Sequence, residues 1–268
     1  MLNKSNKQKI LNALKNKNLV KIISGIQNYD KQKTLSVAVA AEMGGATALD
    51  ICDDKEIIKA TRAIVQMPLF VSSIDPLKLL SAQSLGADVL EIGNYEAFYK
   101  EGRLFTPKQI IEIVSFVKKS VGAIHEIPLL CCTIPATLEI ENQIKLAKEL
   151  LSLGVDILQT EGFIGDIPVS DRQDKVFSEI LKASSTLANT IELRAALPNA
   201  NIICASGITL TTAPLAFTVG ASGIGVGNYI NSLFTQEEME EKVSEIMEII
   251  VHPIHQALQT TKELALKI

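Results

Sequence analysis

The chain of 268 residues contains no tryptophan, only three histidines and only four cysteines. No apolar run approaches the roughly 20 residues that a membrane-spanning helix needs, so we expect no membrane partner. The formal net charge of −4 argues against nucleic acid as a partner. No two cysteines form a CxxC pair, and three of the four lie inside predicted strands while Cys52 ends another, which favours reduced core residues over a disulfide or metal framework.

The few histidines are not placed for chemistry. His125 precedes a predicted strand, whereas His252 and His255 fall in the last helical segment. A zinc hydrolase is therefore disfavoured because its ligands are missing, and no metal site is assigned. The sequence leaves the cofactor undetermined.

Short apolar runs alternate with amphipathic stretches along the whole chain. This alternation predicts a parallel sheet of the α/β class, and eight runs favour a closed (β/α)8 TIM barrel. The expected strands are residues 20–25, 47–52, 69–73, 89–93, 129–133, 157–161, 202–206 and 223–227. No GxGxxG motif follows the first, which weakens a dinucleotide-binding open sheet. We expect a single domain over 1–268, with a short helix in 1–18 covering the bottom of the barrel.

A glycine followed by a small residue precedes every second predicted strand. The motif begins at Gly45, Gly86, Gly154 and Gly220, where glycine ends the preceding helix. The residues four and six positions later are mostly large and apolar, so they suit the face packed on helices. Because strand side chains alternate, the fifth position points into the barrel. The resulting interior layer consists of Asp50, Glu91, Gln159 and Gly225.

Two carboxylates and an amide in one barrel layer are costly to bury without partners or a purpose. Asp50 and Glu91 could be a general acid/base pair whose pKa values are split by mutual repulsion. They could also belong to a hydrogen-bonded structural cluster, or help to hold Mg²⁺ together with Glu161. In the acid/base interpretation, Gln159 and Glu161 orient the substrate.

Basic residues are sparse at the expected catalytic end of the barrel. Lys21 falls at the start of the first predicted strand, and no lysine falls at the C-terminal end of any strand. This placement disfavours a Schiff-base aldolase. Arg172, in the long loop 162–174, could reach a phosphate or a carboxylate.

Two glycine-containing strand ends near the C-terminus predict a phosphate site. In (β/α)8 barrels the loops after strands 7 and 8 commonly bind phosphate, and glycine lets backbone N–H groups approach it closely. Here the candidates are Ser206 and Gly207 after the seventh strand, and Gly225, Gly227 and Asn228 at the end of the eighth. The expected partner is a phosphorylated small molecule.

The segment 203–230 resembles the phosphate-binding half of N-acylmannosamine-phosphate epimerases and of the thiazole synthase of thiamin biosynthesis. Those barrels show an ASGG strand end followed by a GAxxVxVG strand. In this chain Ile208 stands in place of the second glycine of the first motif. The catalytic lysine of those enzymes has no evident counterpart.

Segments 38–46, 50–52, 91–96 and 158–162 resemble the hypothetical chloroplast reading frame family of red-algal plastids and cyanobacteria. The resemblance covers nearly the full length. It implies a plastid stromal protein, or a cytoplasmic one in a cyanobacterium. It implies no reaction.

Three functions follow as hypotheses. The leading one is a lyase or isomerase that acts on a phosphorylated metabolite by carboxylate acid/base chemistry. The second is an FMN-binding oxidoreductase, which flavin absorbance of the purified protein would reveal. The third is a non-catalytic ligand-binding or regulatory barrel, which would bind a phosphorylated ligand without turning it over. Neither catalysis itself nor the oligomeric state can be read from the sequence.

Overall fold

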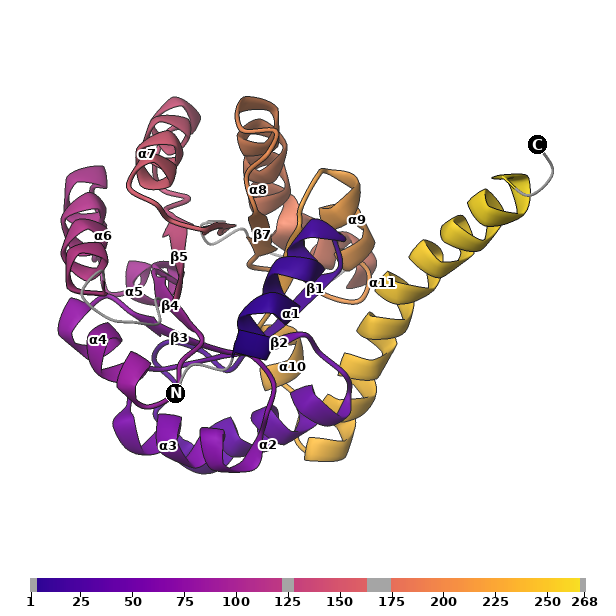
Figure 1. Cartoon of the computed structure of the whole chain (residues 1–268), viewed down its shortest axis with the longest axis horizontal. Helices are drawn as coiled ribbons and strands as arrows, with labels where there is room; N and C mark the ends of the chain where they lie inside the picture. Colours follow the sequence, from indigo (N-terminus) through magenta and orange to yellow (C-terminus); the bar gives the residue numbers. More distant parts are fainter. Residues whose placement is uncertain (1–3, 122–127, 163–174, 266–268) are drawn as a thin grey trace.

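Eight parallel strands close into a barrel in the order β1 to β8, in a computed structural model that describes residues 4–121, 128–162 and 175–265 (Figure 1). The (β/α)8 TIM barrel expected from the sequence is therefore confirmed. The strands are β1 Leu19–Ile23, β2 Ala48–Ile51, β3 Leu69–Ser73, β4 Val89–Ile92, β5 Leu129–Ile134, β6 Ile157–Thr160, β7 Ile202–Ala205 and β8 Gly223–Val226. His125, Arg172 and the loop that carries Arg172 lie outside the described residues, apart from Gly162.

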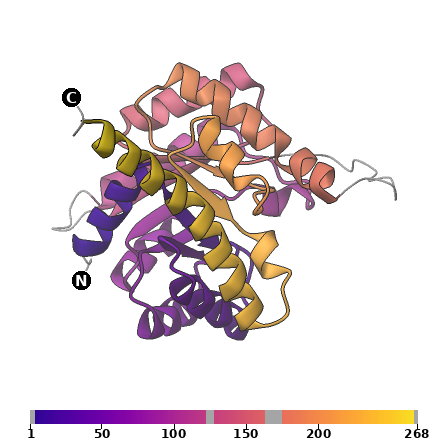
Figure 2. The ribbon, with the colours of Figure 1, turned by 90° about the vertical axis from the view of Figure 1, so that its right-hand side faces the viewer.

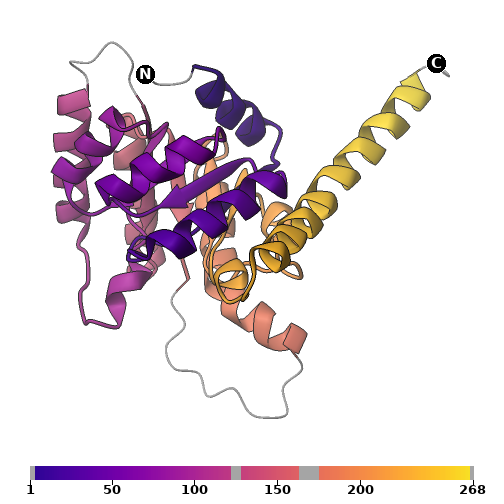
Figure 3. The same ribbon diagram turned by 90° about the horizontal axis from the view of Figure 1, so that it is seen from below.

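Helices surround the barrel and connect its strands. They are α1 Lys4–Lys15, α2 Lys31–Met43, α3 Lys55–Ile64, α4 Pro76–Ser84, α5 Glu96–Tyr99, α6 Pro107–Val121, α7 Ile140–Ser152, α8 Lys175–Ala196, α9 Ala213–Thr218, α10 Asn228–Asn231 and α11 Gln236–Ala265. Aspartates cap α2, α3 and α4 by accepting hydrogen bonds from first-turn N–H groups. Figure 2 views the molecule from the side on which α11 lies, and the last part of this helix projects away from the barrel (Figures 1 and 3). Among the described residues, no helix is both long and apolar enough to cross a membrane.

The repeated glycine motif marks the turns that lead into β2, β4, β6 and β8. All four glycines have positive φ, at 81°, 103°, 87° and 103° in chain order. Residues other than glycine rarely adopt a positive φ, which explains why glycine recurs at this position. The turn also sets the strand register. Leu49, Leu90, Leu158 and Ile224 accordingly pack in the outer core between strands and helices.

A second core fills the bottom of the barrel and is closed by α1. Ile10 and Leu14 of α1 pack in this core against inward-facing strand residues that include Leu19, Phe70 and Ile203. Figure 3 shows α1 at one end of the strands, with α5 and α10 toward the other end. The expected bottom-covering helix is therefore present. The polar layer of the barrel interior lies above this plug.

Candidate functional site

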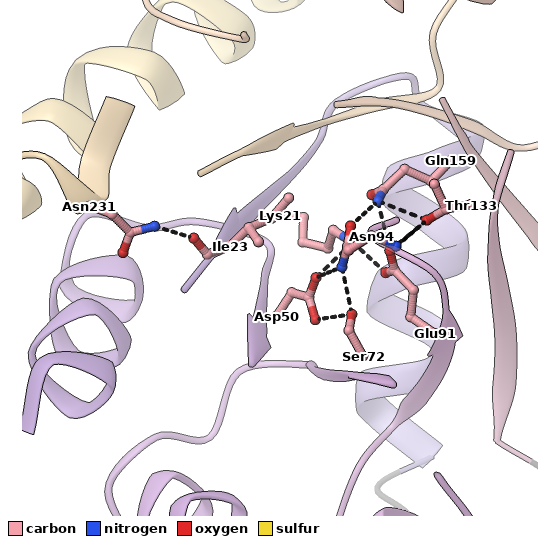
Figure 4. A network of polar contacts seen from close by, with 9 residues as sticks. All are labelled: Lys21, Ile23, Asp50, Ser72, Glu91, Asn94, Thr133, Gln159 and Asn231. Carbon is pink, nitrogen blue, oxygen red and sulfur yellow. Dashed lines mark hydrogen bonds and ion pairs between the residues drawn. The ribbon is translucent and has the colours of Figure 1, made fainter. Parts of the chain in front are cut away.

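The interior layer predicted from the glycine repeat contains an ion-paired cluster. The Nζ of Lys21 lies 3.3 Å from Asp50 Oδ2 and donates a second hydrogen bond to Glu91 Oε2. All three side chains are at most 1% exposed. Figure 4 shows Lys21 reaching between the two carboxylates from the neighbouring strand β1. The structure thus places one buried cation against two buried carboxylates.

Sequence reasoning missed Lys21 as a member of this layer. The first strand begins at Leu19, so Lys21 is at its centre rather than at its start. Its long side chain extends from the apolar layer below to the carboxylates. Nζ also lies 4.8 Å from the centre of the Phe70 ring. The signal was available in the strand sequence LVKII, because a lysine inside a fully buried strand requires a charged partner.

Amide and hydroxyl groups complete the hydrogen bonding of the carboxylates. Gln159 Nε2 donates to Glu91 Oε1 at 2.7 Å. Ser72 Oγ donates to Asp50 Oδ1 at 2.6 Å, and Thr133 Oγ1 lies 3.4 Å from Glu91 Oε1. The predicted grouping of Asp50, Glu91 and Gln159 is thus present as geometry. Its catalytic role stays a prediction.

The cluster binds a proton near neutral pH because its charges do not balance. Burial lowers the pKa of Lys21, but attraction by Asp50 and Glu91 outweighs burial and raises the pKa above its ordinary value. Burial raises the pKa of Glu91 to about 7. The positive charge of Lys21 opposes this rise, and the negative charge of Asp50 adds to it. Lys21 therefore stays protonated while Glu91 exchanges a proton.

A persistent ammonium also bears on Schiff-base chemistry, which needs a neutral lysine. The expectation that no lysine reaches the catalytic end is wrong, because Lys21 Nζ lies in the polar layer. The raised pKa of Lys21 disfavours Schiff-base chemistry instead.

Glu161 belongs to a hydrogen-bond cluster separate from that of Gln159, and its expected role in orienting the substrate stays a prediction. Its carboxylate accepts hydrogen bonds from Tyr99 Oη, from the N–H of Glu96 at 3.1 Å and from the N–H of Ala136 at 3.2 Å. Burial raises the pKa of Glu161 to about 7, and these three donors oppose the rise. The protein therefore holds two carboxyls poised near neutrality.

Replacing Tyr99 by phenylalanine is expected to raise the pKa of Glu161 further, by about one pH unit, because the charged form loses a donor. A carbon-detected NMR titration of the Glu161 carboxyl measures this change. Tyr29→Phe removes a hydroxyl that instead lies 3.5 Å from Asp53, and it should leave Glu161 unchanged. A pKa of Glu161 that is unaltered or lower in Tyr99→Phe would contradict the assigned hydrogen bond.

The two glycine-containing strand ends lie beside this polar layer. A Cβ added at Gly225 would lie 3.5 Å from Gln159 Oε1 and 2.9 Å from atoms of Ala205 and Ile23, so glycine is required by close packing. Gly207 has φ +70°, and an added Cβ would lie 2.6 Å from the Lys182 carbonyl oxygen of α8. Glycine there serves the contact with α8.

The substituted position after Gly207 does not obstruct the mouth of the barrel. Ile208 is 2% exposed and packs in the outer core. Ser206 Oγ donates to Glu96 Oε2 at 2.5 Å, so its hydroxyl is already occupied by a carboxylate. Asn228 is exposed as the first residue of α10, and Asn231 anchors that helix by donating to the Ile23 carbonyl at 2.7 Å (Figure 4).

Four backbone N–H groups at these strand ends lack an acceptor within the described part of the chain. Among the described residues, the N–H groups of Gly207, Ile208, Gly227 and Asn228 donate to no acceptor. The same described part of the chain holds no group of three or more histidine, cysteine, aspartate or glutamate side chains arranged for a metal ion. Lys21 occupies the place between Asp50 and Glu91 that a bridging cation would take.

Comparison of the fold with solved structures supports the barrel architecture alone. A 3-hexulose-6-phosphate synthase superposes with a TM-score of 0.60 at 14% identity, covering 85% of this chain and 98% of the other. A thiamine phosphate pyrophosphorylase from Pyrococcus furiosus gives 0.57 at 16% identity, covering 89% and 99%.

Comparison of the amino-acid sequence with known proteins shows the family of the chain. A protein from Cyanidium caldarium described as uncharacterized protein ycf23 is 36% identical over 248 residues, which is 91% of this chain and 95% of that protein. The ycf23 protein of Pyropia yezoensis is 39% identical over 230 residues, covering 86% and 81%. The family model described as protein of unknown function DUF561 matches residues 4–256. The chain therefore belongs to the DUF561 family, together with the ycf23 proteins.

Proposed function

We propose that this protein is a lyase or isomerase that acts on a phosphorylated small metabolite, with Glu91 and Asp50 transferring protons. The observation that carries the proposal is the unbalanced charge inside the barrel. One lysine faces two carboxylates, and the pKa of Glu91 is raised to about 7 within reach of the glycine end of β8. A structural ion pair needs no second carboxylate, whereas a proton-transfer site needs a group that titrates near neutral pH.

The members of the cluster would have different roles in such a reaction. Glu91 would take and return the proton. Lys21, held as an ammonium, would stabilise negative charge that develops on a substrate oxygen. Asp50 would transfer the second proton, and Gln159 would hold the substrate by hydrogen bonds. This division follows the charge states of Lys21 and Glu91.

The phosphate would be held mainly by backbone donors. The free N–H groups of Gly207, Ile208, Gly227 and Asn228 lie on the loops after β7 and β8. Ser206 Oγ would turn from Glu96 to the phosphate when the ligand binds. Two structurally similar barrels carry names that include phosphorylated compounds, which agrees with this placement.

A direct test of the phosphate site is NMR titration of the full chain with inorganic phosphate and with sn-glycerol 3-phosphate. The amide resonances of Gly207, Ile208, Gly227 and Asn228 should shift together. The amides of Gly45 and Gly86, which precede β2 and β4 at the bottom of the barrel, are the internal control and should not move. Shifts at neither strand end would overturn the phosphate assignment.

A test of catalysis starts from any metabolite that native mass spectrometry finds retained by the purified protein. Turnover of that compound should fall about 100-fold or more in Glu91→Gln and in Asp50→Asn. Glu56→Gln removes an exposed carboxylate from the surface pair with Lys59 and should leave turnover unchanged. Full turnover in both interior variants would refute the acid/base role.

One observation favours a second candidate, a ligand-binding barrel without catalysis. The polar layer is closed, because Lys21, Asp50, Glu91 and Gln159 are at most 1% exposed and bond to one another. In that case the phosphate titration succeeds, but no turnover is found and the interior variants alter only stability.

We also propose that the whole chain forms one domain and works in the plastid stroma, or in the cytoplasm of a cyanobacterium. The support is the match to ycf23 proteins of algae such as Cyanidium caldarium. Immunolocalisation in an alga that carries the protein tests this assignment.

A further inference from the structure

The side chain of Asn94 lies over the polar layer and is hydrogen-bonded to it. Its Nδ2 donates to Asp50 Oδ2 at 3.1 Å and to Ser72 Oγ at 2.8 Å, while its Oδ1 accepts from Gln159 Nε2 at 2.8 Å (Figure 4). Asn94 is half-buried, unlike the other members of the network, which are buried. A ligand that enters from the mouth of the barrel therefore meets Asn94 before it meets Asp50 or Gln159.

The backbone of Asn94 is fixed, so its side chain is the part that can move. Its φ of 59° is left-handed, a conformation that asparagine tolerates better than most residues. Its N–H donates to Thr133 Oγ1 at 3.1 Å. The preceding Gly93 is pressed against Thr133, where an added Cβ would lie 2.3 Å from the side chain. Rotation about the side-chain bonds can withdraw the amide without disturbing these contacts.

Gln159 carries an unused acceptor at the same place. Its Oε1 is buried and accepts no hydrogen bond from any residue that the structure describes. That atom faces Gly225, at 3.5 Å from where a Cβ would stand. A buried acceptor without a donor is destabilising, so a donor from a ligand or a water is expected there. The layer thus offers three positions that a ligand could satisfy.

We propose that the Asn94 amide occupies the place of a ligand that carries a hydroxyl next to a carbonyl, and that the ligand displaces it. The hydroxyl would donate to Asp50 in place of Nδ2, and the carbonyl would accept from Gln159 Nε2 in place of Oδ1. Gln159 Oε1 would accept from a water held beside the ligand. This inference rests on the proposed phosphate site and narrows its substrate to phosphorylated α-hydroxycarbonyl compounds.

The spacing sets the size of the compound. Gly225 lies beside Gln159, and Gly227 lies two residues further along the chain, a rise of about 7 Å at strand geometry. A phosphate at Gly227 and a carbonyl at Gln159 therefore fit a short carbon chain. A nucleotide-sized group is not needed between them.

Calorimetric titration of the full chain with three probes tests the proposal. Dihydroxyacetone phosphate carries the hydroxyl and the carbonyl, sn-glycerol 3-phosphate differs by having the carbonyl reduced, and inorganic phosphate carries neither group. The wild type should bind dihydroxyacetone phosphate more tightly than sn-glycerol 3-phosphate. Asn94→Gly, which suits the left-handed backbone and removes the competing amide, should tighten binding of dihydroxyacetone phosphate about fivefold or more and leave inorganic phosphate unchanged.

A matched control and distinct outcomes keep the test decisive. Lys17→Gly makes the same backbone change at a φ of 54° between α1 and β1, and it should alter none of the three affinities. Equal binding of the two organic phosphates in both proteins would overturn the ligand class but leave the phosphate site standing. Weaker binding of dihydroxyacetone phosphate in Asn94→Gly would overturn displacement. Failure of all three probes to bind would overturn the phosphate site as well.

Discussion

Replacing Lys21 by methionine is expected to lower the free energy of unfolding by about 3–5 kcal/mol at pH 7.5. Methionine fills much of the volume of the lysine stem, but it leaves Asp50 and Glu91 buried without a cation. The remaining donors, among them Ser72 and Gln159, cannot neutralise two carboxylates in this layer. Urea-induced unfolding of the variant and the wild type measures the difference.

The loss in Lys21→Met should depend on pH. Without the ammonium, the folded protein binds protons on its carboxyls more readily than the unfolded chain does, so stability recovers as the pH falls toward 5. The matched control is Lys59→Met, because the pair of Lys59 with Glu56 is exposed and should contribute less than about 1 kcal/mol. If Lys21→Met does not fold, Lys21→Met combined with Glu91→Gln removes one unpaired charge and should recover folding. If Lys21→Met unfolds at pH 7.5 with the same free energy as the wild type, the assigned ion pairs of Lys21 with Asp50 and Glu91 are contradicted.

The second large effect is a loss of wild-type stability as the pH rises from about 4.5 to 7. The pKa values of Glu91 and Glu161 are raised to about 7 in the folded protein from an ordinary value of 4.5. Between these pH values the folded state holds more protons than the unfolded state, so the free energy of unfolding falls with increasing pH. The decrease amounts to at most about 3 kcal/mol for each carboxyl, and it is complete just above pH 7.

Variants separate the two contributions to this slope. Glu91→Gln should remove about half of the decrease, and Glu161→Gln the other half, since the two carboxyls lie in different hydrogen-bond clusters. Glu56→Gln at the surface should leave the slope unchanged. Unfolding free energies at pH 5 and pH 8 are sufficient for the comparison. Equal stability of the wild type at both values would show that these carboxyls titrate normally.

The barrel and its register could be predicted from the sequence because they depend on local signals. The glycine that precedes every second strand needs a positive φ, and alternation along each strand then sets which face points inward. This local logic placed Asp50, Glu91 and Gln159 in one layer. It required no knowledge of how distant strands meet.

The partners of that layer could not be found in the same way. Lys21 reaches its carboxylates from a layer below, and that reach depends on the stagger between β1 and its neighbours. Asn94 covers the layer because of a left-handed turn after β4, which the residue type alone does not indicate. Glu161 accepts a hydrogen bond from Tyr99, which lies on α5, a short helix in the connection that follows β4. Each of these placements is set by tertiary geometry.

The most direct test of the acid/base proposal is a carbon-detected NMR titration of the Glu91 carboxyl in the folded wild type. Comparison with Glu91→Gln assigns the resonance. The charge imbalance around Lys21 predicts a midpoint near pH 7. A carboxyl that stays ionised down to pH 5 would show a balanced structural ion pair and contradict the proposed proton-transfer site.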